Sequence, residues 1–173
     1  VIAHEFQHLI HYNYDRAETT WLNEGMSELA MTINGYEDKA NLDGFTKKHD
    51  VTLIPVGQQV INYGAVMLFG VYLYENTAVG TIKKLVADKE YGIPSVETQL
   101  MANRMGDFTD FFAYMATATL LDTPLLKAFD LSYKDGFASL DFVKPDVDAT
   151  ADMTTGMSGA FQSGFDLEPY TFK

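Results

Sequence analysis

The segment VIAHEFQHLIHYNYD, residues 1–15, decides the fold because it combines an apolar helical pattern with two histidines four positions apart. Its apolar residues recur with the spacing of a helix face, which predicts a buried helix over residues 1–14. Four side chains form that broad apolar face: Ile2, Phe6, Leu9 and Ile10. His4 and His8 lie one turn apart on this helix, so both imidazoles project from the same side.

This spacing suits a metal ion, since two imidazole nitrogens one turn apart can converge on a single cation. Zinc accepts imidazole nitrogens and carboxylate oxygens in tetrahedral geometry, and a catalytic zinc keeps its fourth position for water. Zinc lowers the pKa of that water to about 7. Glu5 projects beside His4 and His8 and can reach the water. The string therefore predicts a water-activating zinc site.

Two residues are alternatives for the third zinc ligand, His11 and Glu24. His11 lies three residues past His8 but seven past His4, so a rigid helix has difficulty bringing all three rings to one ion. Glu24 belongs to the string TWLNEGMSELA, which predicts a second helix over residues 21–33 that a preceding threonine can cap. A short polar connection can return this helix antiparallel beside the first. Glu24 is therefore the better candidate.

A second acid, Glu28, follows Glu24 by one helical turn and can face the first helix. There it can accept the spare ring N–H of His4, which fixes the tautomer and orientation of a ligating imidazole. Trp21, Leu22 and Met26 near Glu24 indicate a partly buried helix, where an unpaired carboxylate would be costly. A metal ion bound to Glu24 removes that cost.

The strings HEFQH and WLNEGMSELA together resemble the gluzincin zinc metallopeptidases, most closely the hyicolysin-like family, with weaker similarity to aminopeptidase N-like gluzincins. The resemblance is strong over residues 1–29. It implies that His4, His8 and Glu24 bind zinc. It also implies that Glu5 is the general base and later the proton donor.

The string NYGAVMLF, residues 62–69, is similar to a segment of aminopeptidase-like gluzincins in which a tyrosine opens a helix. The resemblance implies that Tyr63 stabilises the oxyanion of a tetrahedral intermediate. It further implies an endopeptidase that uses Zn²⁺ to hydrolyse peptide or protein substrates. An aminopeptidase is one alternative. A non-catalytic zinc-containing binding module is another, although a purely structural site needs no general base such as Glu5.

We expect a mainly α fold, with a helical zinc-binding subdomain of a zincin-like metallopeptidase over residues 1–125 and an irregular tail over residues 126–173. Gluzincins have an N-terminal half whose sheet edge aligns the peptide. The resemblance places that half upstream of Val1, so this piece alone is expected to bind metal and to cleave peptides poorly. The polar tail is typical of a linker into a further domain, and residues 165–173 fit a strand.

The middle of the chain predicts further helices after an irregular stretch, residues 36–58, which glycine and proline punctuate. The expected helices cover residues 59–75, 77–90, 93–105 and 107–121. The first of these is apolar nearly all round, so it should be the central core helix. Gly64 and Gly70 should let neighbouring helices approach it closely. Ser95 and Asp107 are predicted to cap the last two helices.

The composition is that of a globular protein, with 173 residues of which 47% are hydrophobic and 21% are charged. A formal net charge of −12 repels nucleic acid and anionic lipid, so we expect neither as a partner. No apolar run reaches the length that membrane insertion requires. The chain has no cysteine, which excludes disulfides, cysteine catalysis and thiolate metal sites. The resemblance and this acidic, cysteine-free composition favour an extracellular location.

Overall fold

A computed structural model describes residues 2–36, 39–48, 51–57, 60–121 and 171–172. The elements of this part are α1 (Ile2–Tyr14), α2 (Thr20–Ile33), α3 (Lys39–Lys47), β1 (Val51–Thr52), α4 (Tyr63–Asn76), α5 (Thr81–Val86), α6 (Ile93–Ala102), α7 (Phe108–Leu121) and β2 (Thr171–Phe172). The prediction of a mainly α fold is confirmed. None of the described helices combines the length and the apolar character that a membrane span requires. Most of the predicted tail lies outside the described residues.

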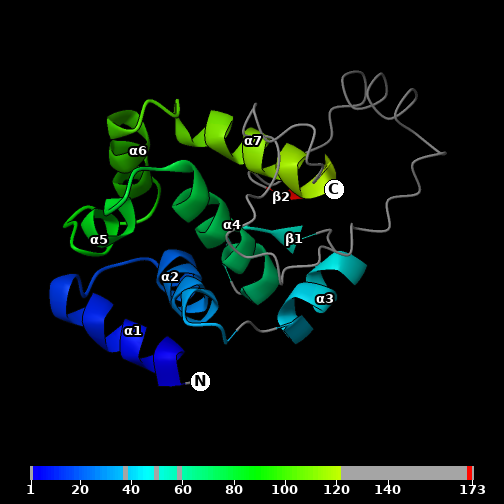
Figure 1. Ribbon diagram of the computed structural model, residues 1–173, viewed down its shortest axis with the longest axis horizontal. Coiled ribbons are helices and arrows are strands. Elements are labelled where there is room, and N and C mark those ends of the chain that lie inside the picture. Colours follow the sequence, from blue (N-terminus) through cyan, green and yellow to red (C-terminus); the bar gives the residue numbers. More distant parts are fainter. Residues whose placement is uncertain (1, 37–38, 49–50, 58–59, 122–170, 173) are drawn as a thin grey trace.

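Helix α4 is the centre of the core, as its all-round apolar sequence predicts. Its residues from Gly64 to Leu73 are all buried. Figure 1 shows α4 between the α1–α2 pair on one side and α6 and α7 on the other. The ring of Phe69 lies with its centroid 5.3 Å from that of Trp21 and 5.9 Å from that of Phe111. One side chain of α4 therefore joins α2 to α7 through aromatic contacts.

Two glycines of α4 let other helices approach it closely, which confirms their predicted role. A Cβ atom at Gly64 would lie 2.5 Å from the carbonyl oxygen of Asn41 and 2.6 Å from Cβ of Phe45, both on α3. A Cβ atom at Gly70 would lie 3.0 Å from the carbonyl oxygen of Gly25 on α2. The absence of side chains at these crossings thus sets the distances of α2 and α3 from the central helix.

The expectation of irregular structure over residues 36–58 is wrong in part, because α3 and β1 form there. Leu42 and Phe45, three positions apart, give α3 a short apolar face that is buried against the core. Gly44 in the helix interior weakens the helical pattern of this segment. Strand β1 pairs antiparallel with β2, which confirms a strand at the end of the chain.

Two helices start four residues later than predicted, and α6 ends at Ala102 rather than at residue 105. The helix expected over residues 59–75 begins at Tyr63, where the side chain of Asn62 caps it by accepting a hydrogen bond from a backbone N–H. The helix expected over residues 77–90 is shorter, since α5 starts only after Gly80. Gly80 has a φ of 91°, a left-handed conformation that separates α5 from the turn before it.

One predicted helix cap is wrong and another is confirmed. Ser95 is buried inside α6, and the capping position belongs to Gly92, because the helix begins three residues earlier than a cap at Ser95 requires. Asp107 caps α7 as predicted, with its Oδ1 accepting a hydrogen bond of 2.8 Å from the backbone N–H of Asp110.

Helix α1 is less buried than its apolar pattern predicts. Ile2, Phe6 and Leu9 are 86%, 60% and 66% exposed, whereas Ile10 packs against the core. The physical reason is that α1 lies against α2 with its histidine-bearing side. The opposite apolar face of α1 is therefore left uncovered in the part of the chain that the structure describes.

We expect Gly64→Ala to destabilise the fold by about 1–3 kcal/mol, because its methyl group would overlap the α3 backbone. Gly44→Ala on α3 is the matched control. A Cβ atom there meets nothing within 4 Å, and this change should stabilise the protein by about 0.4–1 kcal/mol. Urea unfolding of both variants measures the difference, and equal stabilities would contradict the close α3–α4 contact.

Candidate metal centre

Helices α1 and α2 form an antiparallel pair joined by residues 15–19 (Figure 1). Because the chain reverses around residue 16, positions at equal distances from it along the two helices face each other. His4 therefore lies opposite Glu28, and His8 lies opposite Glu24. The four-residue spacing on each helix keeps all four side chains in the interface between the two helices.

Three potential ligand atoms from these helices converge. Nε2 of His4 lies 3.0 Å from Nε2 of His8, and Oε2 of Glu24 lies 3.2 Å and 3.6 Å from these nitrogens. Around a tetrahedral zinc with bonds of 2.0–2.2 Å, neighbouring ligand atoms are about 3.3–3.6 Å apart. The three observed separations fall within or just below this range. Among the described residues this triad is the one such group of His, Asp and Glu side chains.

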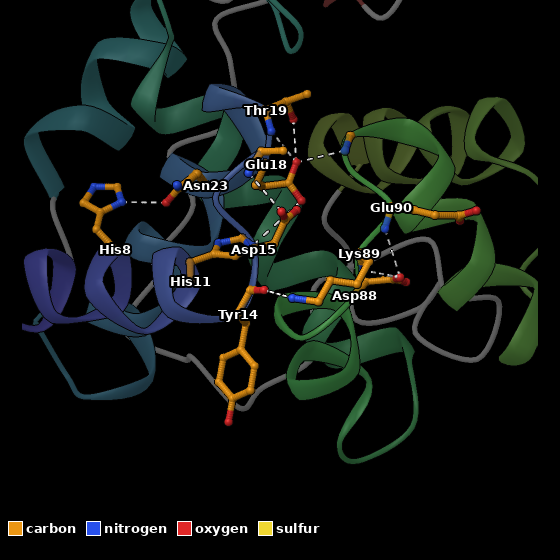
Figure 2. Close-up of polar contacts among 12 residues, drawn as sticks. His8, His11, Tyr14, Asp15, Glu18, Thr19, Asn23, Asp88, Lys89 and Glu90 are labelled. Carbon is orange, nitrogen blue, oxygen red and sulfur yellow. Dashed lines mark hydrogen bonds and ion pairs between the residues drawn. The ribbon is translucent and has the colours of Figure 1, made fainter.

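The outer nitrogens of both imidazoles have acceptors, which fixes their tautomers. Nδ1 of His8 lies 2.6 Å from Oδ1 of Asn23 and 3.1 Å from Oγ of Ser27 (Figure 2 shows the contact with Asn23). Nδ1 of His4 lies 3.1 Å from Oε1 of Glu28. Since amide and carboxylate oxygens accept hydrogen bonds, each Nδ1 carries the proton and donates it. Both Nε2 atoms are then left with lone pairs that point into the triad.

Three lone-pair-bearing atoms at these distances repel one another unless a positive charge lies between them. Oε2 of Glu24 is buried and has no hydrogen-bond partner among the described residues. A divalent cation would satisfy all three atoms at once, and this donor set fits zinc. The side chains of His4, His8 and Glu24 are 13%, 26% and 16% exposed, so the centre lies close to the protein surface.

Tyr63 and Glu5 lie at the edge of the triad. The ring centroid of Tyr63, the first residue of α4, is 6.4 Å from that of His4. Burial raises the pKa of the Tyr63 phenol, and the carboxylates of Glu24, Glu28 and Glu5 raise it further. Tyr63 therefore keeps its proton at neutral pH and can donate a hydrogen bond. Glu5 is exposed and directly follows His4 on α1.

Of the two sequence alternatives for the third ligand, the structure brings Glu24 together with His4 and His8. The other alternative, His11, is fully buried and is not part of the triad. Sequence reasoning missed Asn23 and Ser27 as partners of His8. Their signal was present, because they are two polar residues four positions apart on α2, each directly before one of the acids Glu24 and Glu28.

No family model, curated protein or solved structure matches this chain. The similarity to gluzincins therefore rests on the strings HEFQH and WLNEGMSELA, and it stays a prediction. The geometry of the triad does not depend on that similarity, since it follows from the distances between the side chains.

We expect Asn23→Ala to weaken zinc binding by about 10–100-fold, because His8 would lose the main acceptor that orients its ring. Asn13→Ala is the matched control, since Asn13 is exposed on α1, and it should bind zinc like the unchanged chain. Competition with a chromogenic chelator measures both affinities. Equal affinities would show that Asn23 does not orient the ligand.

We expect the phenol of Tyr63 to titrate above the ordinary pKa of tyrosine in the metal-free protein. Burial and nearby carboxylates both disfavour the phenolate, so the proton is lost at higher pH. NMR of ¹³Cζ-labelled tyrosine follows this titration, and Tyr63→Phe assigns the signal. Glu24→Gln should move the pKa back down, because it removes a negative charge. A Tyr63 pKa at or below the ordinary value would contradict the described surroundings.

Proposed function

We propose that this chain carries the metal centre of a zinc-dependent peptidase, with zinc held by His4, His8 and Glu24. The observation that carries the proposal is the convergence of two Nε2 atoms and one carboxylate oxygen. Because each imidazole carries its proton on Nδ1, the two Nε2 atoms cannot form a hydrogen bond with each other. The outer hydrogen bonds to Asn23 and Glu28 support it, because ligating histidines are normally held in this way.

Zinc bound at such a site polarises a carbonyl oxygen and lowers the pKa of water to about 7. Glu5 stands on the same helical turn as His4 and His8, and it is exposed to solvent. Its carboxylate can accept a proton from water at the centre and deliver it to the leaving amine. A structural metal site has no use for such a group, so Glu5 favours hydrolysis over a purely structural role.

Tyr63 supplies the remaining chemistry in this proposal. Its phenol is close to the ring of His4 and keeps its proton at neutral pH. A neutral phenol at this position can donate a hydrogen bond to the oxygen on which negative charge develops in acyl transfer. A tyrosine phenol is already protonated at neutral pH, and burial, followed by the nearby carboxylates, raises the pKa of Tyr63 further.

The proposed substrate is a peptide or protein, cleaved within the chain by an endopeptidase. The alternatives are an aminopeptidase and a non-catalytic module that binds zinc and a partner. Hydrolysis of amino-blocked peptides separates the first alternative, because an aminopeptidase requires a free amino terminus. Zinc binding without hydrolysis by the longest natural form of the protein would favour the module.

We expect Glu5→Gln to reduce peptide hydrolysis by about 10²–10⁴-fold while zinc affinity stays unchanged, because the change removes the general base but no ligand. Asp43→Asn, an equal loss of charge at an exposed position of α3, is the control and should leave both properties intact. Zinc content by atomic emission and cleavage of a fluorogenic blocked peptide are measured on the same samples.

Three outcomes decide the proposal. Hydrolysis that survives Glu5→Gln would exclude Glu5 as the base. Failure of the unchanged chain to bind zinc would contradict the metal centre itself. Loss of hydrolysis with zinc retained would support the peptidase and the assigned role of Glu5.

A further inference from the structure

A second group of buried polar side chains lies beside the metal centre, at the connection between α1 and α2 (Figure 2). It consists of His11, Asp15 and Glu18. The side chains of His11 and Glu18 are 0% and 1% exposed, and Nε2 of His11 lies 3.8 Å from Oε2 of Glu18. Among the described residues, these two atoms have no hydrogen-bond partner. Burying polar groups without hydrogen-bond partners costs free energy of folding, so a role for these side chains has to explain their position.

The other oxygen of Glu18 joins the start of α2 to the start of α6. Its Oε1 accepts hydrogen bonds from the backbone N–H and the hydroxyl of Thr19, at 2.5 Å and 2.8 Å. It also accepts one of 2.9 Å from the backbone N–H of Gly92. Thr19 is the N-cap residue of α2, and Gly92 is the N-cap residue of α6. With His11 in the last turns of α1, Glu18 contacts the ends of three helices.

A second contact ties the same two connections together. Nζ of Lys89, in the segment before α6, donates a hydrogen bond to the carbonyl oxygen of Tyr14 at the end of α1 (Figure 2). The α1–α2 connection is therefore attached to the α5–α6 connection on both sides of residue 16. These contacts fix where α2 begins relative to the end of α1.

The metal triad depends on this placement, because α1 supplies His4 and His8 whereas α2 supplies Glu24. The connection is only residues 15–19, so a shift at the start of α2 moves Glu24 along α1. A shift of Glu24 by about 1 Å would equal about half the length of a zinc–ligand bond, which is about 2 Å.

We infer that Glu18 is a positioning residue for the metal centre, holding α1 and α2 in the register that lets the three ligand atoms meet. The inference rests on the proposed function, since it concerns the same zinc site. Glu18 contacts none of the three ligands, so it acts through Thr19, His11 and Gly92.

The electrostatics of the group agree with this role. Burial raises the pKa of Glu18. Burial also lowers the pKa of His11; the carboxylate of Asp15 partly offsets this decrease, and His8 adds to it. Burial thus disfavours the charged form of both side chains, and the hydrogen bonds at Oε1 need an acceptor oxygen but no net charge. Glutamine at position 18 can keep that acceptor and donate its amide N–H toward His11.

The experiment compares zinc affinity, by chelator competition, and the visible spectrum of bound Co²⁺ in Glu18→Ala and Glu18→Gln. We expect Glu18→Ala to bind zinc at least about tenfold more weakly, with an altered Co²⁺ spectrum. We expect Glu18→Gln to restore both properties. Met115→Ala is the control for lost stability, because Met115 is fully buried on α7, far from α1 (Figure 1). It should bind zinc like the unchanged chain.

A folded Glu18→Ala variant with unchanged zinc affinity and Co²⁺ spectrum would overturn the inference. If Glu18→Ala does not fold, Gly92→Ala tests the same contact, because its Cβ would lie 3.0 Å from Cγ2 of Thr19 at a φ of 65°. We expect the same tenfold loss there, and unchanged affinity would again overturn the inference. Absence of zinc binding by the unchanged chain would overturn the proposed function as well, so the two failures are distinguishable.

Discussion

The central constraint in this structure is electrostatic, because two imidazole nitrogens with lone pairs and one carboxylate oxygen lie within 3.6 Å of one another. Such an arrangement is unfavourable without a cation between the atoms. It exists because α1 and α2 are held antiparallel in one register, and because Asn23 and Glu28 hold each imidazole proton on its outer nitrogen. The chemistry of the site therefore depends on how rigidly two helices are fixed.

The rigidity comes from the core, through the residue next to Glu24, the proposed third ligand. Gly25 follows Glu24 directly, and its carbonyl oxygen lies 3.0 Å from the position of a Cβ atom at Gly70 on α4. The backbone of α2 thus rests directly on the central helix, which has no solvent-exposed face over ten residues. A helix in contact with the core at Gly25 presents Glu24 toward α1 with little freedom to rotate. The same helix α4 begins with Tyr63, so one element positions both the proposed third ligand, Glu24, and the phenol.

The sequence was sufficient for those features that depend on local spacing. A short connection between two amphipathic helices fixes which positions face each other, so Glu24 and Glu28 could be placed opposite the histidines before any coordinates. The core role of α4 was equally predictable, because a helix that is apolar on all sides has to be buried. Asp107 could be assigned as a cap because its carboxylate accepts a hydrogen bond from a backbone N–H only three residues further along the chain. The facing pairs of α1 and α2 and the cap at Asp107 join positions close in sequence, and the burial of α4 follows from its own composition whatever its partners are.

The features that the sequence did not predict depend on contacts from distant parts of the chain or on which faces are covered. An apolar pattern tells which side of α1 avoids water but not whether anything covers it, so the exposure of Phe6 was not foreseeable. Helix α3 owes its stability to burial against Gly64 more than to its own propensity, which Gly44 lowers. Glu18 is bound by Gly92, 74 positions away, and no local spacing indicates that bond. The proposed ligand residues could thus be identified from local spacing. The precision with which they meet depends on long-range packing, about which a short motif says little.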